Sequence, residues 1–424
     1  MNILMMTNTY KPIVGGIENS IETFSNAYRA MGHKVLIVAP VFKNMPEEEG
    51  VHRIPALQNF NGTDFSVELP VPGILSGILE KFKPDIVHSH HPFLVGDTAL
   101  RVAAAKNIPV VFTYHTMYEK NTHYVPGDSE KLKKFVIQLA AGYCDLCARV
   151  ISPSESVREI LLQRGVRRKI TTIPTGVDFQ RYSRGSGMLF RDSAGIPRDC
   201  FLIGHLGRAA PEKNILFLTD SVAKFMEVRE DAHFVMVGDG ELLENVKQRF
   251  ISRGLRKRAH FPGVLKGDEK INAYHGMDVF CFASKSETQG LVLLESMSAG
   301  VPVIGLDAPG TRDVVKDGIN GRLLADEDER AFVEALDIFR GMDSARKGDL
   351  SAAAKDTAAG FDQKKSVLKM VELYRDVLNE RSAAKDADNS LWSTSKGYIR
   401  VELGLVTNII KSAGTVIKDE FSRD

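Results

Sequence analysis

Short runs rich in valine, isoleucine and leucine alternate with longer amphipathic segments through the first part of the chain. Such runs are typical of buried parallel strands, and apolar residues at helical spacing are typical of helices that cover a sheet. The strand candidates lie at residues 2–6, 35–39, 85–88, 110–114 and 150–151, and the helix candidates at 17–31 and 98–106. The β-α-β-α order predicts a doubly wound parallel sheet.

The pattern breaks near residues 174–178, and residues 184–187 have the glycine, serine and charge content of a linker. In a second series, the strand candidates lie at residues 202–206, 234–237, 279–282 and 301–304, and the helix candidates at 215–228, 242–253 and 292–299. We therefore expect an α/β protein with two Rossmann-like, doubly wound domains that face each other across a cleft. Ligands of such sheets bind at the carboxyl ends of the strands.

These patterns predict an N-terminal domain at residues 1–178, a linker at 179–200 and a C-terminal domain at 201–355. Within residues 356–380, the segment 363–379 is expected to be a closing helix that packs back across the domains. Residues 381–389 are polar, so residues 381–424 are expected to form a polar linker and an amphipathic tail.

The tail combines apolar and cationic side chains at helical spacing. Its apolar residues include Val401, Leu405, Ile409 and Ile410, and its cations include Lys396, Arg400, Lys411 and Lys418. A helix on a membrane surface has this pattern, and so does a helix packed on the protein's own surface. Both interpretations stay open, and unchanged vesicle binding after truncation at Asn379 would exclude the first.

Charge and cysteine content narrow the classes of function. The 55 lysines and arginines exceed the 54 acidic residues by one, so the overall field does not recruit nucleic acid. Four cysteines do not form a disulfide framework, which suits a reducing cytosol. The first residues lack the features of a signal peptide, and no uncharged apolar run approaches the about 20 residues that span a bilayer. We expect a cytoplasmic protein that is soluble or peripheral at the inner face of the membrane.

Two cations lie in the segment 207–213, directly after a predicted strand and before a predicted helix. The Arg208 guanidinium offers a forked donor for phosphate oxygens, and Lys213 offers a mobile point charge. The pair is suited to neutralising a diphosphate leaving group, although a solvated charged turn has the same composition.

The segment 284–291, Ser-Lys-Ser-Glu-Thr-Gln-Gly-Leu, follows another predicted strand and precedes Glu295. Glu287 is expected at the carboxyl end of that strand, and Gly290 is expected to open a helix whose free amides bind phosphate or sugar oxygens. Glu295, further into the helix, can accept hydrogen bonds from a ribose diol. Either glutamate alone is typical of a surface carboxylate, but their joint placement favours a ligand site.

Metal and redox sites are not expected. Cys144 and Cys147 have zinc or redox spacing but no matching second pair, and they are interpreted as buried thiols in a helix. The His88-Ser-His90-His91 segment is interpreted as lining the cleft, because neighbouring side chains after a strand point to opposite faces. The acidic pairs at 326/328 and 386/388 lie outside strands and are not expected to bind a metal.

Five segments occur in the order found in a known family: GRAAPEKN at 207–214, VGDGE at 237–241, FPG at 261–263, SKSETQGLVLLE at 284–295 and AGVPVI at 299–304. Together with Gly15-Gly16-Ile17-Glu18 after the first strand, they resemble the retaining GT-B glycosyltransferases of family four. The resemblance covers nearly the whole chain except the tail. It implies a nucleotide-sugar donor, retention at the anomeric carbon, and no bound metal or redox cofactor.

The resemblance also implies the roles of the donor-site residues. They are Arg208 and Lys213 on the diphosphate, Glu295 on the ribose, Val264 and Leu265 beside the base, Gly238 at the glycine-containing turn, and Glu287 with Thr288, Gln289, Gly290 and Leu291 on the sugar. Gly16 would let its amide approach the phosphate from the N-terminal domain, although Gly15-Gly16 read alone is merely a turn.

The segment HTMYEKNTHYV at 115–125 is similar to bacterial diacylglycerol glucosyltransferases. This narrower resemblance implies UDP-glucose as donor, a lipid acceptor, and an acceptor loop with Tyr118, His123 and Tyr124. His115 matches the acceptor-site histidine of the family, although a lone histidine at such an edge is more often structural. Three lysines at 131, 133 and 134 beside apolar residues are compatible with an anionic membrane surface.

We therefore expect transfer of glucose or a related hexose from a UDP-sugar to a hydroxyl acceptor, diacylglycerol or a related glycolipid. His115, Glu287, Arg208 and Lys213 are the expected catalytic residues, with same-face attack assisted by the departing diphosphate. The alternatives are a saccharide acceptor with a UDP-, GDP- or ADP-sugar, a nucleotide-sugar epimerase, and a non-catalytic sugar-nucleotide binding protein.

Overall fold

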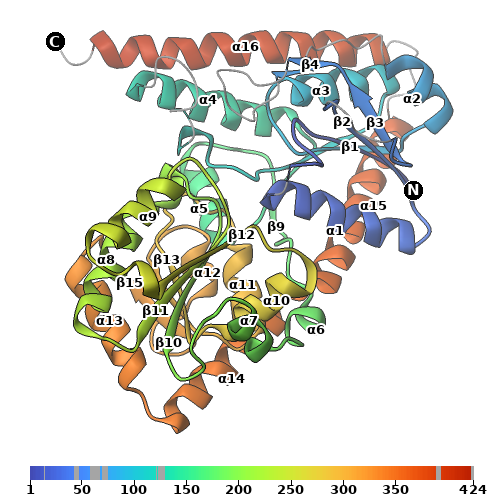
Figure 1. The fold of residues 1–424 in the computed structure, drawn as a ribbon. Helices are drawn as coiled ribbons and strands as arrows, with labels where there is room; N and C mark the ends of the chain where they lie inside the picture. Colours follow the sequence, from blue (N-terminus) through green and yellow to red (C-terminus); the bar gives the residue numbers. More distant parts are fainter. Residues whose placement is uncertain are drawn as a thin grey trace. The chain divides into compact units, whose positions relative to one another are not determined.

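The computed structural model describes residues 1–13, 15–42, 47–57, 67–68, 75–120, 122, 129–387 and 393–421. Two compact units make up the chain (Figure 1). Unit 1 comprises Met1–Thr175 and Ser366–Asp424, and unit 2 comprises Gly176–Lys365. Each unit contains a parallel sheet covered by helices on both faces, so the expected α/β class with two Rossmann-like sheets is confirmed.

The sheet of unit 1 is parallel and has the strand order β3-β2-β1-β6-β7-β8-β9. The strands are β1 (Asn2–Met6), β2 (Lys34–Pro40), β3 (Val51–Ile54), β6 (Ile86–Ser89), β7 (Val110–Thr113), β8 (Arg149–Ser152) and β9 (Ile170–Thr172); β4 (Ala56–Leu57) and β5 (Val67–Glu68) pair separately. Strand order reverses direction between β1 and β6, which makes this the switch point where ligands of doubly wound sheets bind.

Helices cover both faces of this sheet because side chains alternate along each strand. Leu4 and Met6 pack with α2 (Ser76–Phe82), α3 (Val95–Lys106), α4 (Glu130–Leu146) and α5 (Glu155–Gln163). Ile3 and Met5 pack on the other face with α1 (Gly16–Ala30) and α15 (Gln363–Ala387).

Helix α15 begins at the residue expected for the closing helix, but it continues to Ala387. The first part of the expected polar linker, residues 381–387, is therefore helical. It contains three alanines and neither glycine nor proline, so nothing in it stops the helix. The Arg149 guanidinium, on β8, anchors the helix through Glu380 at 2.7 Å.

The sheet of unit 2 is also parallel and has the order β12-β11-β10-β13-β14-β15. Its strands are β10 (Phe201–Leu206), β11 (Ala232–Val237), β12 (Ala259–Gly263), β13 (Val279–Phe282), β14 (Val303–Leu306) and β15 (Gly321–Leu324). One face packs on α8 (Ile215–Val228), α9 (Leu243–Ser252) and α13 (Glu329–Gly341), and the other on α10 (Gly267–Gly276), α11 (Leu291–Ser298) and α14 (Ser344–Gly360). The short helix α12 (Thr311–Val314) follows β14.

The stretch 179–200, expected as a linker, is a packed part of unit 2. It contains α6 (Phe179–Tyr182) and α7 (Gly187–Ser193), with Phe190 buried in the core. Arg191 binds the Asp278 carboxylate at 2.8 Å and donates to the Gly276 carbonyl at 2.9 Å. Glycine and serine here are helix-flanking residues, since Ser186 caps α7, and not signs of a flexible connection.

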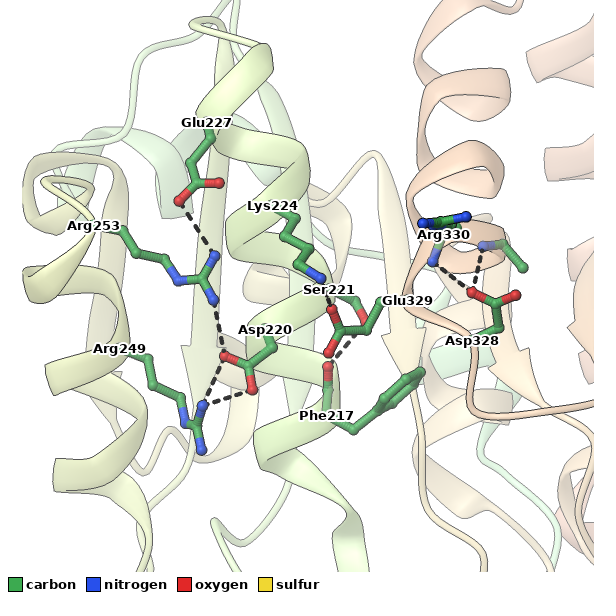
Figure 2. A network of polar contacts seen from close by, with 11 residues as sticks. Phe217, Asp220, Ser221, Lys224, Glu227, Arg249, Arg253, Asp328, Glu329 and Arg330 are labelled. Carbon is green, nitrogen blue, oxygen red and sulfur yellow. Dashed lines mark hydrogen bonds and ion pairs between the residues drawn. The ribbon is translucent and has the colours of Figure 1, made fainter.

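A network of ion pairs joins α8 to its neighbours on the surface of unit 2 (Figure 2). The Asp220 carboxylate accepts from Arg249 and Arg253 of the α9 region, at 2.6 and 3.4 Å. Lys224 binds Glu329 at the start of α13. Such partly exposed pairs contribute little stability each, and they join helices of the layer that covers one face of the sheet.

Candidate active site

Loops after four neighbouring strands of unit 2 carry the residues expected in the donor site. The segment 207–213 follows β10, the glycine turn 238–240 follows β11, Val264 and Leu265 follow β12, and the segment 284–290 follows β13. These strands are adjacent in the order β12-β11-β10-β13, and order reverses direction between β10 and β13. The sheet therefore brings segments distant in sequence to one edge.

The first two loops touch through their backbones. The Gly207 amide donates to the Val237 carbonyl at 3.0 Å. A Cβ at Gly238, where φ is +140°, would lie 2.0 Å from the Gly207 carbonyl oxygen. Gly238 is therefore required by close packing of the two loops, and any side chain there would push them apart.

Each of the two expected cations contacts a carboxylate. Arg208 binds Glu212 within its own loop at 2.5 Å, and Lys213 binds Glu287 from the loop after β13. The hydroxyls of Ser284 and Ser286 both donate to the Glu212 carbonyl, at 3.2 and 3.1 Å. The two loops are thus fastened together, and two cations and two carboxylates gather at one sheet edge.

Gly290 precedes α11 and has φ +71°, a conformation that favours glycine. A turn that the sequence patterns did not single out lies against this loop: a Cβ at Gly310, where φ is +76°, would lie 3.0 Å from the Glu287 carbonyl oxygen and 2.9 Å from the Gln289 amide. The Pro309-Gly310 dipeptide, a turn signal after a strand, could have revealed it. Gln289 is buried, and Thr288 and Leu291 are partly exposed.

Glu295 lies in α11 and accepts three hydrogen bonds within unit 2. Its Oε1 accepts from Tyr182 at 2.8 Å and from the Lys270 ammonium at 2.7 Å, and its Oε2 accepts from Tyr274 at 2.7 Å. The three donors come from α6 and α10 and were missed by sequence reasoning, because no spacing rule connects them to α11. A carboxylate has about four acceptor positions, so capacity for one further donor remains.

The residues expected beside the base differ in exposure. Val264 is 58% exposed, whereas Leu265 is partly buried against the core of unit 2. They follow Gly263, which is the last residue of β12 and whose carbonyl accepts from the Gly238 amide at 2.9 Å. The base-side segment is therefore tied to the same glycine turn as the segment 207–213.

His205, in β10, is a further residue near this edge. Its Nδ1 donates to the Cys281 carbonyl at 3.0 Å, and its Nε2 has no hydrogen-bond partner among the described residues. A Cβ at Gly207 would lie 3.4 Å from that Nε2. Burial lowers the pKa of His205 to about 4, so the ring is neutral at pH 7. The sequence pattern gave no sign of this role, because His205 lies within an apolar run that predicts a buried strand.

In unit 1, the loops after β1, β6 and β7 hold the other expected residues, and these strands are also adjacent. Gly15 caps α1 and Gly16 is its first residue. A Cβ at Gly16 would meet no other described atom within 4 Å, so the space beside this residue is open. Glu18, in the same turn, is buried and accepts from the Thr9 hydroxyl.

His115 forms a hydrogen bond with a second histidine that sequence reasoning had treated only as a cleft residue. The His115 Nε2 lies 2.9 Å from the His90 Nδ1, and the two rings stack with centroids 5.1 Å apart. Burial, together with the charges of neighbouring histidines, holds the pKa values of both rings well below 6.5. Both are therefore neutral at pH 7, and His115 can orient a hydroxyl without carrying a charge.

The loop after β7 is held by an ion pair. Arg164, at the end of α5, binds Glu119 at 2.6 Å and donates to the Tyr114 hydroxyl at 2.9 Å. Tyr118 begins a short helix, Tyr118–Lys120, and its ring meets Phe93 edge-on at 5.2 Å. The expected acceptor residues His123 and Tyr124 lie outside the described residues.

The cysteine pair is buried, and the first histidine of the His88-Ser-His90-His91 segment is held by two hydroxyl groups. Cys144 and Cys147 are buried free thiols, as expected. His88 lies between the Tyr374 hydroxyl, 2.5 Å from its Nδ1, and the Thr113 hydroxyl, 2.7 Å from its Nε2. Across the residues with described positions, no cluster of three or more His, Cys, Asp or Glu side chains is arranged to hold a metal ion.

Two family models match this chain, one in each half of the sequence. The model of the family "Glycosyltransferase Family 4" matches residues 14–181, and that of "Glycosyl transferases group 1" matches residues 189–354. An alpha-monoglucosyldiacylglycerol synthase of Streptococcus pneumoniae is 30% identical over 345 residues, covering 79% of this chain and 78% of the relative. A GDP-mannose-dependent alpha-mannosyltransferase of Corynebacterium glutamicum is 26% identical over 388 residues, covering 89% of both chains.

A solved structure supports the same fold. Anabaena HepE, crystallised in complex with UDP, superposes with a TM-score of 0.73 at 19% identity, covering 89% of this chain and all of that one. The match extends over both units and thus assigns the GT-B fold class to the chain.

Proposed function

The chain belongs to glycosyltransferase family 4, and on that premise we propose that it transfers glucose from UDP-glucose to the hydroxyl of diacylglycerol or a related glycolipid. The observation that carries the proposal is the gathering of Arg208, Lys213 and Glu287 at the carboxyl edge of the unit 2 sheet. Cations at this edge suit a diphosphate, and the S. pneumoniae synthase supports a glucosyl group and a diacylglycerol acceptor.

In the proposed donor complex, Arg208 and Lys213 bind the diphosphate, and the remaining acceptor capacity of Glu295 takes a ribose hydroxyl. Val264 and Leu265 lie beside the base. Glu287 and the backbone of residues 288–291 bind the sugar, and the Gly16 amide approaches the phosphate. The proposed reaction uses no metal and no redox cofactor, and the nucleotide sugar is a substrate.

The proposed reaction retains the configuration at the anomeric carbon. The bond from C1 to the diphosphate oxygen breaks, and the diphosphate leaves with the electron pair. The acceptor oxygen then bonds C1 from the same face and gives its proton to a diphosphate oxygen. Lys213, Arg208 and the free amides at the start of α11 stabilise the charge that develops on the leaving group. His115, neutral at pH 7, orients the sugar and the acceptor.

Purified protein mixed with UDP-glucose and diacylglycerol vesicles tests the proposal. We expect acceptor-dependent release of UDP and a hexosyl lipid identified by mass spectrometry. UDP-glucose binding without any transfer would indicate a binding protein, and an altered sugar nucleotide without acceptor would indicate an epimerase.

A second candidate is mannosyl transfer from GDP-mannose, which the C. glutamicum relative favours. The same protein offered GDP-mannose in place of UDP-glucose separates the two, because the base contacts at Val264 and Leu265 cannot suit both nucleotides equally. A saccharide acceptor would be indicated by transfer to soluble glycans and not to lipid.

A further inference from the structure

Helix α16 (Ser393–Phe421), beyond the segment matched by the family models, lies along α4 and α3 in unit 1 (Figure 1). One face of α16 makes defined contacts with the rest of unit 1. Leu405 is buried in the core, and the Asn408 amide donates to the Leu139 carbonyl at 2.9 Å. Arg101, on α3, binds Glu402 at 2.7 Å. The helix is therefore docked along one side by apolar, hydrogen-bonded and charged contacts.

The opposite side of the same helix is apolar and exposed. Ile399, Leu403, Val406 and Ile410 are 59%, 62%, 52% and 64% exposed. Their spacings of four, three and four residues align them in one stripe along the helix, about 16 Å long. Isolated exposed apolar residues are ordinary, but four on one stripe form a continuous surface that water solvates poorly.

Cations flank this stripe. Arg400 and Lys411 are exposed, and at 100° per residue they share a second stripe beside the first. From Ile399 to Thr415 the sequence contains one acidic residue, Glu402, which faces Arg101 on the inner side. The outer side of this segment thus combines apolar and positive groups without a carboxylate.

Helix α4, in whose first turn Lys133 binds Glu130 at 2.9 Å, packs beside α16. Gly404 lies beside Leu146, and Asn408 lies beside Gly142 and Leu139, so α4 and α16 run antiparallel. The amino-terminal turns of α4, which carry Lys131, Lys133 and Lys134, therefore lie toward the carboxyl-terminal half of α16.

We propose that the stripe Ile399, Leu403, Val406 and Ile410 docks unit 1 on an anionic lipid surface. The apolar side chains would enter the boundary between headgroups and acyl chains, and the flanking cations would lie among the lipid phosphates. A second copy of the chain fits less well. A twofold pairing of the stripes would bring Arg400 and Lys411 of both copies together without a compensating carboxylate.

The purpose of this docking rests on the proposed function, since diacylglycerol resides in the bilayer, but the docking itself is measured without turnover. Sedimentation with vesicles of phosphatidylcholine, and of phosphatidylcholine mixed with phosphatidylglycerol, gives the partition coefficient. We expect Leu403→Gln combined with Ile410→Gln to lower partitioning onto the mixed vesicles by about tenfold or more, because two apolar side chains no longer leave water.

Leu368→Gln is the matched control, because Leu368 is 59% exposed in unit 1 on α15 and lies outside the stripe. It should partition like the unaltered protein. Arg400→Gln combined with Lys411→Gln should weaken binding to the mixed vesicles by about tenfold and make it less sensitive to salt, while binding to phosphatidylcholine alone changes little.

Unchanged partitioning of the Leu403→Gln, Ile410→Gln variant would overturn the proposal, provided that its thermal midpoint matches that of the unaltered protein. Light scattering that shows a dimer converted to a monomer by this variant would also overturn it, since a second copy would then cover the stripe. Stripe-dependent vesicle binding without any glycolipid product would refute the proposed function and leave the docking surface standing.

Discussion

Lys213 and Glu287, 74 positions apart in the sequence, form an ion pair between the loops after β10 and β13. Both side chains are partly buried, with 26% and 18% of their surfaces exposed. The pair joins two neighbouring strand ends on opposite sides of the switch point of the unit 2 sheet. Because one partner is cationic and the other anionic, the two side chains can address different parts of a nucleotide sugar, the diphosphate and the hexose.

Lys213→Ala should lower turnover by about 10²- to 10³-fold, because the charge on the leaving diphosphate loses a preorganised cation. The free energy of unfolding should change by about 1 kcal/mol or less. Lys224→Ala is the control, since it removes a partner of Glu329 in the ion-pair network of Figure 2 and should leave turnover unchanged. Activity lost only in proportion to thermal stability would count against a catalytic Lys213.

Glu287→Ala should reduce the rate at saturating donor, because the carboxylate is proposed to hold the sugar in the reacting geometry. The loss should exceed about tenfold, as measured by UDP release. Glu287→Gln, which keeps the size of the side chain and some hydrogen-bonding capacity, should retain more activity. If the alanine variant turns over at the original rate once donor is saturating, Glu287 does not belong to the site.

Glu295→Gln should raise the KM for the donor by about tenfold and destabilise unit 2 by about 1–3 kcal/mol. The charge of the carboxylate is lost, and the Lys270 ammonium keeps a neutral partner only. Tyr182→Phe removes one of the three donors to Glu295 and leaves the carboxylate in place. Its KM should therefore change far less, and equal effects of the two substitutions would argue for a structural role alone.

Acid should destabilise the protein through its buried histidines. Burial lowers the pKa of His88 to about 3 and that of His205 to about 4, below the 6.5 of an unfolded histidine. The unfolded chain therefore binds more protons below pH 6.5, so this stability is complete above pH 6.5 and is lost as the pH falls toward 4. Each such histidine adds up to about 1.4 kcal/mol per pH unit to the slope.

Denaturant titrations between pH 7.5 and 4.5, at roughly unit intervals, measure that slope. His88→Gln should lower stability at pH 7.5 and flatten the slope, because one titrating group is gone. An unchanged slope in the variant would show that His88 takes up its proton equally in the folded and unfolded states.

Much of the fold follows from local patterns. The boundaries of β1 and α8 match the expected segments 2–6 and 215–228, because apolar runs and helical spacing there are uninterrupted. The strands β3, β9, β12 and β15 were not singled out. They lie at or near sheet edges, are only partly buried, and so lack continuous apolar runs.

The candidate site also contains residues that local motifs point to and contacts that depend on packing. Glu287, Lys213 and Gly238 could be proposed as site residues from the sequence, because each lies in a short motif of consecutive residues. Lys270 and Tyr182 on Glu295, and His90 on His115, were not assigned these roles, since such contacts depend on how helices and strands pack.

The tail shows most clearly which features follow from the sequence and which depend on the tertiary structure. The sequence by itself determined that residues 391–421 favour an amphipathic helix, because apolar and cationic residues recur at helical spacing. Only the tertiary structure decided which apolar residues face the protein: Leu405 is buried against unit 1, whereas Leu403 and Ile410 are exposed. A helix with apolar residues on two sides has two faces that could be buried, and the fit of Gly404 and Asn408 against α4 selects one of them.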